Sequence, residues 1–232
     1  MRTRTAAVAT LGTSVLLPLL VPAAAHADTA KGDTVFTSVN FNEKTFNVGV
    51  SAARTVSVAA TAKDRSGING ILGAKLVSSD DRIVHDRTDY YDLRNSSAGT
   101  WRFTAEAVAK DGDFYDLETS ARIQVKRLAR LATTQAGPEP VAKGAKLTVK
   151  GTLTRADWNT NTYVPHAGRS VALQFKRSGT STYTTVKTVT TDSAGKLRAT
   201  VTASSSGTWR WKAAATSTTS GATAYGDSVT VK

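Results

Sequence analysis

Residues 97–103 read Ser-Ala-Gly-Thr-Trp-Arg-Phe and residues 205–211 read Ser-Ser-Gly-Thr-Trp-Arg-Trp, so one seven-residue pattern occurs twice in the chain. Each copy is followed by small residues at alternate positions. Each is also followed by a strand-like stretch that ends in lysine, Ile-Gln-Val-Lys at 123–126 and Val-Thr-Val-Lys at 229–232. Self-similarity on this scale indicates two copies of one domain.

Alternating apolar and polar residues surround both copies of the pattern. The alternation is clearest at 146–153, 170–176 and 197–201, where leucine, valine, alanine and phenylalanine share one face. Short alternating strands separated by Gly, Ser and Asp turns are typical of antiparallel sandwiches. We therefore predict an all-β fold. We expect the repeated tryptophans, Trp101 and Trp209, to be core anchors, because burying one aromatic ring stabilises a fold by roughly 2–3 kcal/mol.

The first 27 residues have the pattern of a secretory signal peptide. Arg2 and Arg4 precede an uncharged stretch, and Ala25-His26-Ala27 supplies the small-x-small motif of a cleavage site. The alternative is a membrane-spanning helix, which needs about 20 mostly apolar residues; here threonine, serine, glycine and proline interrupt the stretch. We expect a secreted, extracellular product that begins at Asp28 and has no membrane anchor.

Charge divides the rest of the chain into two parts, which we predict to be domains. Residues 28–127 contain 14 Lys and Arg against 14 Asp and Glu, whereas residues 128–232 contain 14 against 4. We expect residues 128–133 to link the domains, and Pro138 and Pro140 to lie in an edge strand that starts the second. A strongly basic extracellular domain attracts anionic polymers. The alternative is that these scattered charges only solvate the surface.

The sequence offers little for catalysis. It has no cysteine, which excludes thiol chemistry and thiolate metal sites. His85 and His166 fall in different domains, neither has a metal-ligand spacing, and no nucleophile elbow or phosphate loop is present. We therefore predict that the protein is not an enzyme, and we expect no cofactor unless calcium binds.

Several motifs resemble those of known secreted proteins. Asp64-Arg65-Ser66-Gly67-Ile68 and the Ala-Lys-Asp-Gly-Asp at 109–113 are similar to the B–C and F–G loops of bacterial immunoglobulin-like repeats. The stretches 151–158, 171–177 and 183–189 are similar to the C-terminal domain of secreted two-domain proteins from Gram-positive bacteria with GC-rich genomes. The resemblance spans the mature chain and implies two tandem immunoglobulin-like β-sandwiches. It implies little about activity, since such proteins are largely uncharacterised and some are labelled calcium-binding.

A metal site is predicted at one end of the first domain. In an immunoglobulin-type sandwich the B–C and F–G loops emerge at the same end, which places Asp64 near Asp111, Asp113 and Asp116. Calcium takes 6–8 oxygen ligands, and clustered carboxylates with loop carbonyls supply them. The alternative is that these aspartates only build turns.

A second candidate site lies in the second domain, on a predicted long connection between residues 155 and 169. Trp158 and Tyr163 could stack on sugars while Arg155 and Arg169 bind phosphates or uronates. Alternatively, in a head-to-tail pair this connection lies against the first domain, and the aromatic residues pack at the junction.

Together these features predict a non-enzymatic binding protein. We expect it to attach to an anionic extracellular polysaccharide or cell-wall polymer through its basic second domain. The alternative is a calcium-stabilised structural or protein-interaction module. No feature indicates a specific nucleic-acid partner.

Overall fold

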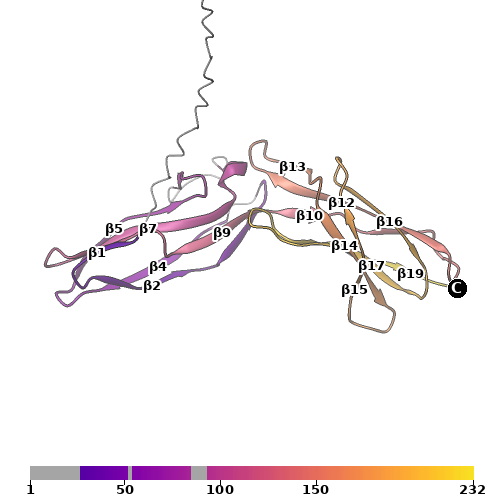
Figure 1. Ribbon diagram of the computed structural model, residues 1–232, viewed down its shortest axis with the longest axis horizontal. Coiled ribbons are helices and arrows are strands. Elements are labelled where there is room, and N and C mark those ends of the chain that lie inside the picture. Colours follow the sequence, from indigo (N-terminus) through magenta and orange to yellow (C-terminus); the bar gives the residue numbers. More distant parts are fainter. Residues whose placement is uncertain (1–26, 52–53, 85–92) are drawn as a thin grey trace, which may run out of the picture.

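The computed structural model describes residues 27–51, 54–84 and 93–232. Its regular elements are strands in two β-sandwiches placed end to end (Figure 1), together with one 3₁₀ turn, η2 (Asn95–Ser97). The predicted all-β fold of two tandem β-sandwiches is thus confirmed. No helix in this part of the chain has the length and hydrophobicity needed to cross a membrane. The predicted signal peptide, apart from Ala27, lies outside the described residues, as do His85, Asp86, Asp89 and Asp92.

The first sandwich consists of a large sheet and a two-stranded one. The large sheet contains β1 (Thr29–Lys31), β8 (Phe114–Leu117), β7 (Gly99–Ala109), β5 (Ile68–Val77), β6 (Ile83–Val84), β9 (Arg122–Arg127) and β3 (Thr45–Val48). The small sheet pairs β2 (Val35–Phe41) with β4 (Val58–Lys63). Strand β3 runs parallel to β9, whereas the other strand pairs described in this sandwich are antiparallel.

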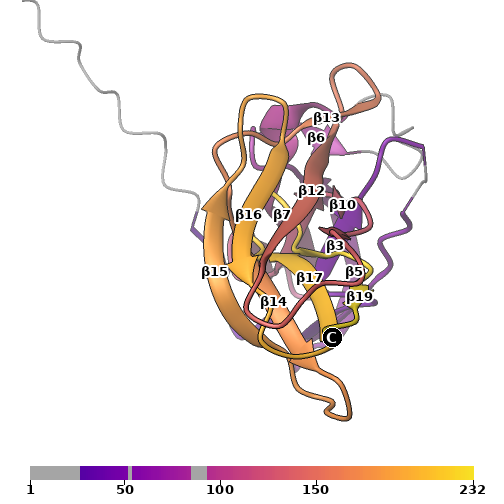
Figure 2. The ribbon, with the colours of Figure 1, turned by 90° about the vertical axis from the view of Figure 1, so that its right-hand side faces the viewer.

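The second sandwich consists of two five-stranded sheets. One contains β10 (Ala129–Leu131), β11 (Gln135–Gly137), β12 (Lys146–Asp157), β13 (Thr162–Pro165) and β16 (Lys196–Thr202). The other contains β14 (Ser170–Arg177), β15 (Thr184–Thr190), β17 (Gly207–Ala213), β18 (Ala222–Thr223) and β19 (Asp227–Val229). Seen from the C-terminal end, β12 and β16 lie side by side in one layer, with β14 and β17 in the other (Figure 2).

The repeated seven-residue pattern leads into a central strand of each sandwich, β7 in the first and β17 in the second. Trp101 and Trp209 are each 4% exposed, as expected for core anchors, and Trp211 is fully buried. The Trp101 indole N–H donates to the carbonyl of Ser97, 2.6 Å away. In the second core, Gly151 makes room for Trp211, because a Cβ at Gly151 would lie 2.6 Å from Cδ1 of the indole. The pattern therefore recurs because it leads into the corresponding central strand of each core.

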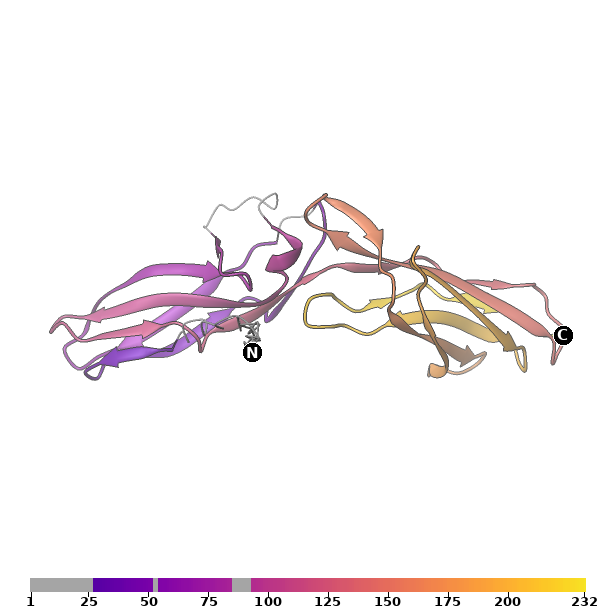
Figure 3. The same cartoon turned by 45° about the horizontal axis from the view of Figure 1, so that its top comes forward.

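The segment predicted as a linker is instead part of the second sandwich. Residues 129–131 form β10, which pairs with β12, and Ala129 and Leu131 belong to the second hydrophobic core. The chain passes from β9 to β10 almost without interruption (Figure 3), separated by Leu128 alone. The prediction was wrong because residues 128–133 were treated as a spacer, although their inward positions carry apolar side chains. Pro138 and Pro140 follow the edge strand β11 and do not lie in it.

Candidate functional sites

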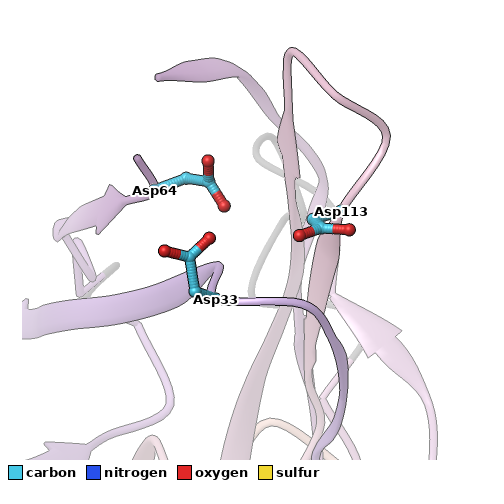
Figure 4. A group of neighbouring side chains, drawn as sticks. All are labelled: Asp33, Asp64 and Asp113. Carbon is cyan, nitrogen blue, oxygen red and sulfur yellow. The ribbon is translucent and has the colours of Figure 1, made fainter. Parts of the chain in front are cut away.

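Three aspartates from three segments meet at the end of the first sandwich that lies away from the second sandwich. Asp33 follows β1, Asp64 follows β4, and Asp113 precedes β8, and one carboxylate oxygen from each lies within 4.8 Å of the others (Figure 4). Two of these segments are the loops that sequence analysis placed together, so Asp64 and Asp113 do meet. A group of carboxylates from separate loops is the kind of donor set that hard cations use.

Hydrogen bonds fix the orientation of Asp64. Its Oδ1 accepts from the backbone N–H and hydroxyl of Ser66 at 2.7 and 2.8 Å, and its Oδ2 accepts from the hydroxyl of the buried Thr34 at 2.9 Å. The Ser66 hydroxyl is the main reason that the pKa of Asp64 is lowered. Lost hydration and the neighbouring Asp64 raise the pKa of Asp33, although Arg65 lies 3.2 Å from Asp33 and opposes this. The electrostatic strain of this acidic pair is the kind that a bound cation relieves.

Asp111 and Asp116 lie outside this group, so their placement as ligands needs correction. Asp111 closes its own turn, because its Oδ1 accepts from the backbone N–H of Asp113 at 3.2 Å. Asp116 lies in β8, and its Oδ2 accepts from the hydroxyl of Thr29 at 3.2 Å. Asp111 therefore builds a local turn and Asp116 pairs across strands, which are common uses of aspartate in sandwiches.

Asp33 is the member of the group that sequence analysis missed. It lies in the Gly32-Asp33 turn after β1, and this turn is brought to the site because β1 pairs with β8. Gly32 has a positive φ of 77°, and a Cβ there would overlap the carboxylate of Asp113. The Gly-Asp pair was a visible turn signal, but the pairing that positions it was not.

Trp158 is buried at the junction of the two sandwiches, so it cannot stack on a sugar as the ligand hypothesis requires. Its side chain is 2% exposed and packs in the cluster that contains Phe46 and Trp101 of the first sandwich. Its indole N–H donates to the carbonyl of Val48 at 3.3 Å, and its backbone N–H donates to the side chain of Asn95 at 3.0 Å. The alternative, interdomain packing, is what the structure shows.

The outer face of β12 explains this burial. Even-numbered positions from Lys146 to Thr154 are polar, whereas the next two on the same face are apolar: Ala156 is fully buried and Trp158 nearly so. Side chains alternate between the faces of a strand, so the switch from polar to apolar marks where the first sandwich covers the second. The predicted long connection is in fact a hairpin of β12 and β13.

Tyr163 is also occupied at this junction. The guanidinium carbon of Arg130 lies 3.8 Å from the centroid of its ring. Its hydroxyl is buried, without a hydrogen-bond partner among the described residues, and fits above Gly49, where a Cβ would come within 2.8 Å. Tyr163 is therefore a packing residue, and one ring face already carries a cation.

The two arginines of the predicted ligand site are brought together around a histidine. Nη1 of Arg155 lies 3.5 Å from Nε2 of His166, which is 7% exposed. Burial first, and then Arg155, Arg169 and Arg127, lower the pKa of His166 to about 4. Sequence analysis missed Arg127, although a single arginine in the otherwise apolar row Ile123, Val125, Ala129, Leu131 was a signal.

The outer face of β12 and β16 carries an uncompensated group of cations. We call Lys146, Lys150, Lys196 and Arg198 the basic face; all four are exposed, and Lys150 lies directly opposite Arg198. Threonines fill the intervening positions Thr148, Thr152, Thr200 and Thr202. The two strands have no acidic residue on this face.

No protein-family model matches the sequence, and no curated protein matches it. Solved structures that are similar to the chain include the following two. The D00-D0 domain of intimin has a TM-score of 0.30 and 15% sequence identity, with 83% of this chain and 98% of that chain covered. The three N-terminal domains of the bacteriophage RB49 highly immunogenic outer capsid protein (Hoc) have a TM-score of 0.31 and 14% identity, with 86% of this chain and 71% of that chain covered.

Proposed function

We propose that the protein is a non-enzymatic, extracellular binding module that attaches to an anionic polysaccharide or cell-wall polymer through the basic face of its second sandwich. In this proposal residues 28–127 and 128–232 are separate domains that share one buried junction. The second domain supplies the binding surface, and the first holds it at a fixed orientation.

The observation that carries the proposal is the pairing of Lys150 with Arg198. Like charges directly opposite each other on neighbouring strands destabilise a sheet. A fold that only needed solvation would gain from an acidic residue at one of these positions, yet none occurs on this face of β12 and β16. A polyanion lying along the face would offset the repulsion and would also accept hydrogen bonds from the threonine hydroxyls.

Retention of the purified protein on an immobilised polyuronate and on purified bacterial cell wall, at low and high salt, tests this function. Replacing both Lys150 and Arg198 by Gln should weaken retention about tenfold or more, since each cation near an anionic surface contributes about 1 kcal/mol. High salt should release the unmodified protein.

The matched control replaces Lys143 and Lys212 by Gln, which removes the same net charge away from the basic face. Lys143 lies in a loop, and Lys212 lies in β17 of the other sheet. Equal losses in both double variants would mean that net charge alone attracts the polymer. Retention that ignores both salt and the Lys150 and Arg198 variant would contradict the proposal.

A second candidate function, calcium binding, is favoured by the meeting of Asp33, Asp64 and Asp113 within 4.8 Å. Calcium would stabilise the end of the first sandwich that lies far from the junction. Calorimetric titration with calcium chloride should show saturable heat that Asp64→Asn removes. Asp111→Asn alters the turn that carries Asp113 but keeps an Oδ1 acceptor for the backbone N–H of Asp113, and because Asp111 lies outside the group it should leave the heat unchanged. The absence of heat at millimolar calcium would exclude this function.

A further inference from the structure

Arg127 lies where the chain passes from one hydrophobic core to the other. Along β9 and β10 the inward positions are apolar on both sides of it: Val125 belongs to the first core and Ala129 to the second. Arg127 itself is only 6% exposed. A charged side chain at such a position needs a partner, because burying an unpaired charge is costly.

Two arginines and a histidine of the second sandwich lie nearby: Arg155 acts on Arg127, and Arg155, Arg169 and Arg127 all act on His166. Arg155 is the inward residue of β12 after the fully packed Leu153, and it contacts His166, which follows β13. Arg169 precedes β14, and its backbone N–H donates to the hydroxyl of Thr191 at 2.9 Å. The same hydroxyl donates to the carbonyl of His166 at 2.7 Å, so one threonine holds this loop in place.

The polar atoms at the centre of this group lack partners. Nε of Arg127, Nε of Arg155 and Nδ1 of His166 are buried, and none has a hydrogen bond within the part of the chain that the structure describes. Asp157 lies close enough to favour the charged form of Arg127. Its Oδ1, however, already accepts from the backbone N–H groups of Asn159 and Thr160 at 3.0 and 3.2 Å.

The pKa values of Arg127 and His166 reflect burial beside positively charged neighbours, an environment that favours an anion. Burial and the neighbouring Arg155 lower the pKa of Arg127, and the surrounding arginines contribute to the low pKa of His166. Both shifts have the sign that burial and neighbouring positive charge produce together. At neutral pH the imidazole is uncharged and offers either an N–H donor or a lone pair, whereas the guanidinium groups remain donors only.

We propose that Arg127, Arg155, His166 and Arg169 form a binding site for one oxyanion, a phosphate, sulfate or carboxylate group, at the junction of the two sandwiches. Guanidinium groups suit this ligand because their planar donors match the oxygens of phosphate and carboxylate. Arg155 and Arg169 are partly exposed and give the anion access. Since Arg127 comes from the first sandwich, a bound anion links the two sandwiches.

This site is independent of the basic face, and the two can fail separately. Calorimetry and thermal unfolding of the purified protein with sodium phosphate, sodium sulfate or sodium glucuronate, each compared with sodium chloride at equal ionic strength, test it. We expect saturable heat and a higher unfolding temperature with at least one of the three. Tightest binding by phosphate or sulfate identifies a tetrahedral ion, and by glucuronate a sugar carboxylate. No response beyond that of chloride would overturn the proposal.

Variants separate a built site from general charge. Arg155→Gln and Arg169→Gln alter partly exposed residues, and each should raise the Kd for the oxyanion at least tenfold, because each removes a charged hydrogen-bond donor from the site. Lys143→Gln removes the same charge from an exposed loop outside both proposed sites and should leave this Kd unchanged. Equal weakening in all three variants would overturn the proposal. Loss of polymer retention with intact oxyanion binding would refute only the proposed function.

Discussion

Arg54 and Arg198 are both exposed arginines, but only Arg54 has a carboxylate beside it. Glu43 lies 2.7 Å from Arg54, Asp33 lies 3.2 Å from Arg65, and Asp81 lies 2.7 Å from Arg102, all in the first sandwich. Among the described residues, the second sandwich contributes no such pair. The two sandwiches therefore differ in surface charge. Three arginines of the first have a carboxylate partner, whereas the exposed cations of the basic face have none.

We expect the largest loss of stability from a substitution that separates the two sandwiches, which would allow each to be studied by itself. Trp158→Ala should cost about 3 kcal/mol, because it empties a buried aromatic position between the cores. We expect urea unfolding to change from one transition to two, followed by intrinsic fluorescence and by near-ultraviolet circular dichroism. Tyr225→Ala, which alters a side chain that is 84% exposed, is the control and should leave one transition. A single unchanged transition in Trp158→Ala would show that Trp158 does not hold the two sandwiches together.

Lowering the pH should have the next largest effect and should distinguish the two sandwiches, because the groups with shifted pKa values titrate in different pH ranges. His166 has a folded pKa of about 4 against 6.5 when unfolded, so the unfolded chain binds the extra proton. Stability should therefore fall as pH drops from about 6.5 to 4, by up to about 3 kcal/mol. Burial is the main cause of the lowered pKa of His166, and the neighbouring Arg155, Arg169 and Arg127 add to it, with Asp157 near Arg127.

In the first sandwich the corresponding group is Asp28. Burial raises its pKa, but hydrogen bonds from Ser120, Thr119 and Glu118 outweigh this and lower the pKa to about 2. Its contribution should be lost only as pH falls from about 4 to 2. Urea titrations across pH, with His166→Gln and Asp28→Asn as references, check both ranges. A His166→Gln profile identical to that of the unmodified protein between pH 6.5 and 4 would contradict the assignment.

The ion pairs of the first sandwich should have the smallest effect. Arg54 and Glu43 are 42% and 45% exposed in their side chains, so Arg54→Gln should change the free energy of unfolding by less than about 1 kcal/mol. Salt should reduce even this difference. A larger loss of stability in chemical denaturation would mean that ion pairs stabilise the first sandwich. The difference in surface charge between the sandwiches would then reflect stability and not ligand binding.

Much of the fold was predictable because local patterns encode it. The repeated tryptophan pattern located the central strand of each core, and alternation identified β12, β14 and β16. The segment 128–133 was mispredicted because Arg127 interrupts an apolar row whose continuation, Ala129 and Leu131, belongs to the next core. Burial of Arg127 depends on residues far along the chain, and a local pattern does not contain them.

The sites were less predictable, because each depends on strand pairing between distant segments. Loop order alone brought Asp64 to Asp113, but Asp33 joins them through the pairing of β1 with β8. Asp111 and Asp116 differ from Asp113 only in how their turn and strand direct them. In the same way, the change from polar residues to Ala156 and Trp158 on one face of β12 is visible in the sequence, but the first sandwich that covers these two residues is not.

The most direct test of the central claim is the effect of Lys150→Glu on stability and binding together. A glutamate opposite Arg198 replaces a repulsive cross-strand pair with an attractive one, so the free energy of unfolding should rise by roughly 0.2–1 kcal/mol. Retention on the anionic polymer should fall at the same time. We therefore predict that the free energy of unfolding rises while retention falls. Retention equal to that of the unmodified protein, at any stability, would contradict the claim that the basic face binds the polymer.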